Sequence, residues 1–333
     1  MKHPIKNIEK RVAIIGCLNI TKDLILGMAR HGYHFDHCIS FRPPLQETAG
    51  ISGYCDLTPI LNNMGVPVTI VEKYNMGSDT DREKLQSLDI DIAIVYGWQR
   101  LVPKWFLDCL SIGVFGTHGS GKPLPFGRGR SPVNWSIIQG KRTFFSHLFK
   151  YDTGIDDGPV AAVQEIEITA FDTCQTLLNK CTIAMVNMCL KELPSIIDGT
   201  VILKSQDGEG ASYYPKRNKE DGIIDWEDAT SEIYNLVRAV ARPYPGAFSF
   251  LENKEDKSVL IWRAIPFDTP FIWPLAGPGE IVEVFCDGTF IVRTGDSALF
   301  VLESEGHEFS NEDIGKKFGN ANIKRKRWPD LPV

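Results

Sequence analysis

Residues 112–135 read IGVFGTHGSGKPLPFGRGRSPVNW and residues 151–158 read YDTGIDDG, and these two stretches decide the fold of the 333-residue chain. The apolar run before His118 and the run SHLFKYD that ends at Asp152 each predict a strand. Open α/β sheets bind ligands at the carboxyl ends of their strands. The pattern therefore predicts a proton-transfer site with a loop of Gly, Pro and Arg beside it.

His118 and the nearby aspartates supply the candidate chemistry. The small residues that follow His118 predict an exposed imidazole that can move protons near neutral pH. A carboxylate beside an imidazole orients it, so Asp152, Asp156 and Asp157 are candidate partners. The alternatives are a hydrogen-bonded loop histidine and aspartates that serve turn formation.

Arg128 and Arg130 form a candidate clamp for a carboxylate or phosphate, with a solvated loop as the alternative. His31, His34 and His37 recur at intervals of three, which is one pattern of metal ligation. They straddle a predicted helix end and the next strand, however, so they should not converge. We expect no metal site.

Strand and helix patterns alternate along the first part of the chain. An apolar run at 11–16, a helical pattern over 21–33 and an extended run at 34–41 form a β-α-β opening, and similar units follow. Such alternation implies parallel pairing with right-handed crossovers. Gly16 lacks the second and third glycines of a dinucleotide-binding fingerprint, so that alternative is weak. We expect an α/β fold with a Rossmann-like, mostly parallel sheet.

The pattern changes after a long amphipathic helix expected over residues 170–198. A connector rich in Gly, Lys, Asp and Ser follows it, and beyond the connector lie four or five short strands. These strands predict a small antiparallel barrel or sandwich. We expect a catalytic domain at 1–205, a smaller OB-like barrel domain at 206–305 and a solvated basic tail at 306–333.

The composition limits the classes of function. A net charge of −6 and a pI near 5.7 disfavour nucleic acid as a partner. No run reaches the ~20 apolar residues of a membrane span and no signal segment is evident, so we expect a cytoplasmic protein with no membrane partner. The eight cysteines lack CxxC spacing, which favours buried free thiols over disulfides or zinc.

The His118 loop and its surroundings resemble the folate-dependent formyltransferase family. The family loop runs N-x-H-x-S-L-L-P-x-x-R-G and is followed by D-x-G-x-D-x-G; here GTHGSGKPLPFGRGRSP and DTGIDDG match it. VYGWQRLVPKWFLD at 95–108 resembles the stretch before the family loop. Residues 221–264 resemble the C-terminal barrel, above all in the branch that formylates nucleotide-linked amino sugars. The resemblance spans about residues 11–305.

By this resemblance the chain would be an N-formyltransferase with 10-formyltetrahydrofolate as its formyl donor. His118 would mediate proton transfer as a substrate amine attacks the formyl carbon, and Asp156 would orient and support the histidine. Nine residues would line the cofactor cleft: Tyr96, Gly97, Trp98, Leu101, Arg128, Gly129, Arg130, Ser131 and Pro132.

One departure from the family concerns the developing oxyanion. The family places Asn two residues before the histidine, and this chain has Gly116 there. Losing such a donor typically costs roughly 3 to 4 kcal/mol of transition-state stabilisation. Lys122, Ser120 or Thr117 could supply a substitute donor. The alternative is a catalytically impaired or altered protein, which binds, regulates or hydrolyses.

The loop after the second strand bears on which amine is accepted. The family's tRNA enzymes carry a Lys/Arg-rich loop there, whereas this chain offers Arg42 against Glu47 and Asp56, so tRNA is disfavoured. The expected partner is a small-molecule amine: a nucleotide-linked amino sugar or an amino-acid-like intermediate. A homodimer is left open. Four connector residues are suited to stack on a base and meet a diphosphate, with a solvated linker as the alternative: Tyr213, Tyr214, Lys216 and Arg217.

Overall fold

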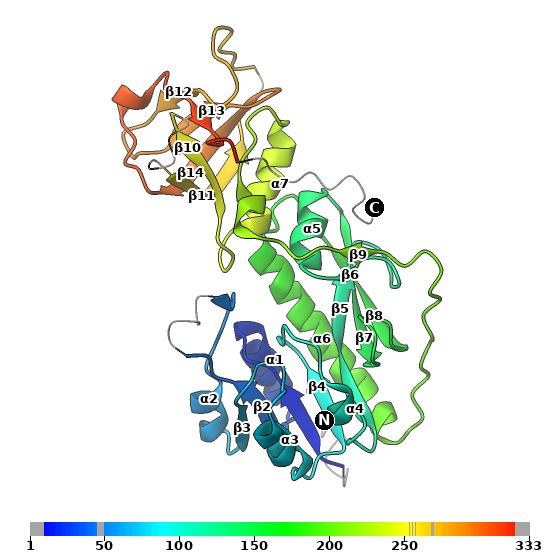
Figure 1. Ribbon diagram of the computed structural model, residues 1–333. Helices are drawn as coiled ribbons and strands as arrows, with labels where there is room; N and C mark the ends of the chain where they lie inside the picture. The colour runs from blue at the N-terminus through cyan, green and yellow to red at the C-terminus, as the bar shows by residue number, and fades with distance from the viewer. Residues whose placement is uncertain are drawn as a thin grey trace. The chain divides into compact units, whose positions relative to one another are not determined.

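The computed structural model describes residues 10–44, 50–252, 254, 256, 258–267 and 270–323 (Figure 1). The chain divides into two compact units. Unit 1 contains the residues through Gly129 together with Thr143–Glu167 and Leu178–Tyr213. Unit 2 contains Arg130–Arg142, Ile168–Leu177 and the residues from Tyr214 onward. The boundary expected at residue 205 stays a prediction.

Unit 1 is built on one seven-stranded sheet, in the order β3-β2-β1-β4-β5-β7-β8. Strands β3, β2, β1, β4 and β5 pair in parallel, while β7 runs antiparallel to both of its neighbours, β5 and β8, which confirms the mostly parallel sheet. The strands are β1 (Val12–Ile15), β2 (His37–Phe41), β3 (Val68–Val71), β4 (Ile92–Val95), β5 (Gly113–Ser120), β7 (Thr143–Lys150) and β8 (Val160–Glu167).

Apolar clusters cover both faces of this sheet, because successive residues of a strand point to opposite sides. Ile14 faces a cluster that includes residues of α1 (Asn19–Arg30), α2 (Thr58–Asn63) and α6 (Cys174–Ile197). Ile15 faces a second cluster that includes residues of two further helices. These are α3 (Asp79–Gln86) and α4 (Lys104–Leu107).

Unit 2 is built on a six-stranded antiparallel sheet, in the order β12-β13-β14-β11-β10-β15, which confirms the β-rich second domain. Its strands are β10 (Ala247–Leu251), β11 (Ser258–Pro266), β12 (Ile281–Val284), β13 (Phe290–Arg293), β14 (Ala298–Glu305) and β15 (Phe318–Gly319). Its helices are α5 (Pro132–Ile138), α7 (Thr230–Val240) and the short 3₁₀ turns η3 (Lys219–Gly222) and η4 (Asn311–Asp313).

Two segments expected in the first domain pack in unit 2. Asn134 of α5 donates a hydrogen bond from Nδ2 to the carbonyl of Ala239 at 2.6 Å. The buried Arg238 donates to the carbonyls of Thr169 and Asp172 at 3.1 and 2.6 Å. Helix α7 therefore holds both segments through buried polar contacts.

The expected basic tail divides into two parts. Strand β15 lies within it and pairs with β10, so residues up to 323 belong to the sheet domain. The rest of the tail, residues 324–333, lies outside the described residues, as does Glu47.

Candidate active site

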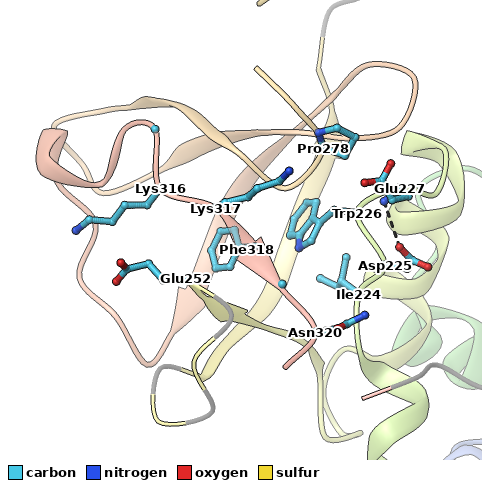
Figure 2. A pocket seen from close by; sticks show the side chains of 12 residues that line it. Ile224, Asp225, Trp226, Glu227, Glu252, Pro278, Lys316, Lys317, Phe318 and Asn320 are labelled. Carbon is cyan, nitrogen blue, oxygen red and sulfur yellow. Dashed lines mark hydrogen bonds between the residues drawn. The ribbon is translucent and has the colours of Figure 1, made fainter. Parts of the chain in front are cut away.

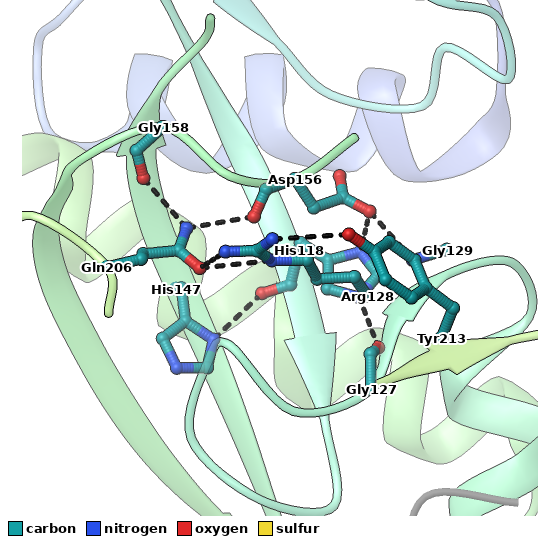
Figure 3. Close-up of polar contacts among 9 residues, drawn as sticks. All are labelled: His118, Gly127, Arg128, Gly129, His147, Asp156, Gly158, Gln206 and Tyr213. Carbon is teal, nitrogen blue, oxygen red and sulfur yellow. Dashed lines mark hydrogen bonds and ion pairs between the residues drawn. The ribbon is translucent and has the colours of Figure 1, made fainter. Parts of the chain in front are cut away.

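His118 lies near the carboxyl end of β5, opposite His147 of β7. Its side chain is buried, with the whole residue 8% exposed, so the expected exposed imidazole is wrong. The loop after β5 folds back over the ring, and Nε2 lies 2.8 Å from the carbonyl oxygen of Gly127 (Figure 3). A carbonyl can only accept a hydrogen bond, so Nε2 carries the proton of this contact.

Asp156 completes a pair with His118. Its Oδ2 lies 3.3 Å from His118 Nδ1 and accepts a hydrogen bond from the backbone N–H of Gly129 at 2.9 Å (Figure 3). The backbone of Asp156 is left-handed, with φ of 51°, a conformation that aspartate tolerates better than most residues. Gln206 holds this turn, because its Nε2 donates to the carbonyls of Asp156 and Gly158, each at 2.8 Å. The carboxylate is therefore fixed from both its side chain and its backbone.

The other two aspartates of the stretch are exposed and do not reach the imidazole. Asp152 accepts a hydrogen bond from the N–H of Thr153 at 2.7 Å, which is the turn role given above as the alternative. Gly158 closes the turn: a Cβ there would collide with the backbone carbonyl of Lys150. The turn thus brings one of its three aspartates to His118.

Arg128, in the short strand β6 (Arg128–Gly129), is buried rather than free to clamp a ligand. Its guanidinium donates to Gln206 Oε1 at 2.7 and 3.3 Å and to the hydroxyl of Tyr213 at 3.3 Å (Figure 3). Arg130 is exposed and belongs to unit 2. The expectation of an Arg128–Arg130 clamp is therefore wrong for Arg128, whose donors hold the wall of the site.

His147 was missed by the sequence interpretation. Its Nδ1 donates to the carbonyl of His118 at 3.2 Å, and its Nε2 accepts from the N–H of Leu124 at 3.2 Å. Burial lowers its pKa to about 4, which matches a neutral ring that donates at one nitrogen and accepts at the other. His147 therefore ties the loop to β5. The signal for it was a polar residue inside an apolar strand.

The segment expected to border the folate follows β4. Tyr96 is buried, and its hydroxyl lies 2.9 Å from Thr182 Oγ1. Its N–H donates to the carbonyl of Ile15 at 3.0 Å and its carbonyl accepts from the Thr21 hydroxyl at 2.6 Å, so its polar groups are engaged inside unit 1. Gly97 has a positive φ of 76°, and Leu101 is 65% exposed. The ring of Trp98 packs edge-on to Tyr74, and its buried Nε1 has no hydrogen-bond partner in the part of the chain that the structure describes.

The residues expected after the Arg loop and in the connector are divided between the units. Ser131, with φ of 57°, and Pro132 begin α5 in unit 2. Tyr213 is half exposed in unit 1. Tyr214 is buried, and its hydroxyl donates to Gln139 in unit 2, so the expectation that Tyr214 stacks on a base is wrong. Both tyrosines lie in the short strand β9 (Tyr213–Tyr214).

The last two connector residues also belong to unit 2. Lys216 is exposed. The guanidinium of Arg217 lies 5.3 Å from the ring centre of Trp135, within the range of a cation–π contact.

The expected substitute donors make contacts with residues other than His118 and Asp156. Thr117 faces the opposite side of the sheet from His118, and its hydroxyl lies 3.3 Å from that of Ser146, so its expected role is wrong. Ser120 shares the face of His118, but it is buried two residues beyond it and accepts from the N–H of Lys122 at 3.5 Å. The ammonium of Lys122 lies over the ring of Phe126.

A separate cavity of about 660 Å³ lies in unit 2, lined in part by Trp226, Lys317 and Phe318 (Figure 2). It contains none of the residues around His118. Within the described ranges, no cluster of His, Cys, Asp or Glu is arranged to hold a metal ion. No helix in those ranges is both long and apolar enough to cross a bilayer.

Comparison with known proteins agrees with this architecture. The formyl transferase family model matches residues 61–191, and the model of the formyl transferase C-terminal domain matches residues 216–313. The bifunctional polymyxin resistance protein ArnA of Wigglesworthia glossinidia brevipalpis is 34% identical over 250 residues, which are 75% of this chain and 36% of that protein. The chain thus spans about a third of the length of this relative.

Two solved structures share the fold. An N-formyltransferase from Helicobacter canadensis, in complex with folinic acid and dTDP-3-aminofucose, has a TM-score of 0.62 at 18% identity, over 88% of this chain and 98% of that one. A HypX variant from Aquifex aeolicus has a TM-score of 0.62 at 18% identity, over 89% of this chain and 45% of that one. The two family models and the 34% identity to ArnA over 75% of this chain show that the chain belongs to the formyl transferase family.

Proposed function

We propose that this protein is an N-formyltransferase that moves a formyl group from 10-formyltetrahydrofolate to the amine of a nucleotide-linked amino sugar. The observation that carries this proposal is the His118–Asp156 pair at the carboxyl end of β5, with 3.3 Å between its reactive atoms. An amine that attacks a formyl carbon must lose a proton, and the leaving nitrogen must gain one. A fixed imidazole–carboxylate pair is suited to both transfers.

The folate is best accommodated by the segment after β4. The Nε1–H of Trp98 has no hydrogen-bond partner among the described residues and would donate to an acceptor atom of the pterin, because a buried donor gains most from a partner. Gly97, which precedes Trp98 and has a positive φ of 76°, would border the ligand with its backbone. When bound, the folate supplies the activated formyl group; the protein supplies orientation and proton transfer.

The state of the pair determines how the proton moves. Nε2 of His118 is engaged with Gly127, so the nitrogen whose protonation can change without moving the loop is Nδ1, which faces Asp156. The Asp156 side chain is 21% exposed against 7% for His118, so the carboxylate is the more accessible member of the pair. We therefore propose that the His118–Asp156 pair accepts the proton of the attacking amine. Asp156, the more exposed member of the pair, would face the substrate.

The substrate class rests on charge and on the relatives. Arg42 is paired with Asp56 at 3.0 Å, which leaves little free positive charge for tRNA at this point of the loop. The Helicobacter canadensis enzyme is described with a dTDP-linked amino sugar, which supports the same class here. An amino-acid-like amine remains the second candidate and is one arm of the test.

The test is incubation with 10-formyltetrahydrofolate and a panel of dTDP- and UDP-linked amino sugars, free amino acids and initiator tRNA. We expect release of tetrahydrofolate that requires an amino-sugar nucleotide, and formation of the N-formyl product by mass spectrometry. Asp156→Asn keeps the shape and the left-handed turn but removes the charge, and it should lower turnover by about 100-fold or more. Release without any amine would instead indicate hydrolysis, and release only with tRNA would reject the small-molecule class.

A further inference from the structure

The phenol of Tyr151 occupies the space beside Gly116. A Cβ placed on Gly116 would lie 2.5 Å from Tyr151 Cε1, 2.6 Å from Oη and 2.7 Å from Cζ. Gly116 and His118 are two residues apart on β5 and so present the same face of the sheet. The phenol oxygen therefore lies on the face that carries His118, in the volume that a side chain at position 116 would fill.

The position of Tyr151 is well supported. Its backbone N–H donates to the carbonyl of Val114 at 2.7 Å, and its ring stacks on Phe149 with 5.1 Å between centres. The ring also packs against the apolar cluster that contains Val95 and Val114. These contacts fix the ring on the His118 face of β5, as a residue that acts on a bound substrate requires.

The phenol keeps its proton at neutral pH. Burial raises the pKa of Tyr151, and the negative charge of Asp156 raises it further. A protonated hydroxyl at this place is available as a hydrogen-bond donor.

We propose that the Tyr151 hydroxyl donates a hydrogen bond to the oxygen of the formyl group during transfer. The hydroxyl would take this role because it fills the volume that a side chain at position 116 would occupy. This inference rests on the proposed function. Along a strand, positions 116 and 118 are about 6.6 Å apart. A formyl oxygen held by Tyr151 and an amine held by the His118–Asp156 pair fit within that span.

In the proposed transfer each bond formed is matched by a bond broken, and Tyr151 is left unchanged. The amine nitrogen forms a bond to the formyl carbon, and an electron pair of the C=O bond moves to the oxygen, where Tyr151 stabilises the negative charge. The amine proton passes to the His118–Asp156 pair. The electron pair then returns, the bond from carbon to the donor nitrogen breaks, and that nitrogen takes the proton from the pair.

The first test compares Tyr151→Phe with Tyr33→Phe. Tyr33 is a matched control, because it is a buried tyrosine that packs against the opposite face of the sheet. We expect Tyr151→Phe to lower kcat by about 100-fold to 1,000-fold, with the KM for the formyl donor and the Kd for tetrahydrofolate changed less than about threefold. Tyr33→Phe should retain kcat. A Tyr151→Phe protein with kcat within about threefold of wild type would overturn the inference.

The second test is independent of activity. Gly116→Ala should lower the Tm of the wild type, because its Cβ meets the Tyr151 ring, and should lower it less in a Tyr151→Ala background. Gly116→Asn alone should not raise kcat, whereas Gly116→Asn in the Tyr151→Ala background should raise kcat above Tyr151→Ala alone. Equal Tm losses in both backgrounds would show that Tyr151 does not fill the space and would overturn the inference.

The two proposals fail in different ways. An active wild type with an equally active Tyr151→Phe overturns the role of Tyr151 alone. A wild type that binds tetrahydrofolate but transfers no formyl group to any amine overturns the proposed function, and the role of Tyr151 with it.

Discussion

Lowering the pH from 7 to 5 should weaken the folded state through His147, and the size of the effect follows from its burial. The ordinary pKa of 6.5 falls to about 4 in the folded protein because burial penalises the charged ring. The unfolded chain therefore takes up a proton that the folded chain resists. The contribution of His147 to stability is full above pH 6.5 and is lost as the pH falls toward 4. Between pH 7 and pH 5 the loss is about 2 kcal/mol.

The measurement is the free energy of unfolding in urea at both pH values, for wild type and for His147→Gln. The glutamine does not titrate, so its pH-dependent loss should be smaller than that of the wild type by about 2 kcal/mol. Subtraction removes the contributions of other groups, including His37, whose pKa is also lowered by burial. His34→Gln, at an exposed position, is the control and should show the wild-type loss. Equal losses in wild type and His147→Gln would refute the reasoning, as would an NMR titration of the His147 ring with a midpoint near 6.5.

Three further predictions follow from other contacts. Arg238→Leu should lower the free energy of unfolding of unit 2 in urea by about 2 to 4 kcal/mol, because the carbonyls of Thr169 and Asp172 lose a buried donor. Arg263→Leu, at an exposed position, is the control, and equal stabilities of the two variants would contradict the prediction. Gly158→Ala should lower turnover by about 100-fold, because its Cβ meets the Lys150 carbonyl and displaces Asp156; Gly208→Ala, in open space, should not. Native protein should react rapidly with a thiol reagent at Cys109 and Cys286, more slowly at Cys55, and at the other five cysteines only after denaturation; a faster reaction of the buried five would indicate local opening.

The fold could be predicted because its signals are local. Short apolar strands alternated with helical patterns in the first part of the chain, and the antiparallel strands of the second part were separated by Gly and Asp. Strand β8 was not expected, because its sequence VAAVQEIE lies mostly exposed at the sheet edge and shows little apolar alternation. The packing of residues 130–142 and 168–177 in unit 2 depends on α7, which is distant in sequence, and no local pattern reports such a contact.

The site could be predicted in part, for the same reason. The strand pattern predicted His118 and the aspartates just beyond strand ends, and the family resemblance singled out Asp156. The structure places His118 inside β5, near its carboxyl end, with Asp156 Oδ2 3.3 Å from its Nδ1. The sequence interpretation missed the burial of His118, because a glycine-rich loop gives no sign that it folds back onto the ring. It also missed Tyr151, because Gly116 was interpreted as a missing amide, whereas the structure fills that volume from β7's end. Each error concerns a contact that depends on strand pairing or on a loop that folds back onto the sheet. The residues adjacent in sequence do not determine such a contact.

The loop over His118 links its own conformation to protonation at two points. Gly127 accepts from the His118 ring, and Leu124 donates to the His147 ring. Protonation of His147 would remove the lone pair that accepts from Leu124, so the loop would lose one attachment while the other remained. Proton transfer at His118 Nδ1, which faces Asp156, leaves the attachment at Gly127 in place. Acid should therefore loosen the loop at Leu124, whereas formyl transfer through the His118–Asp156 pair does not require the loop to open.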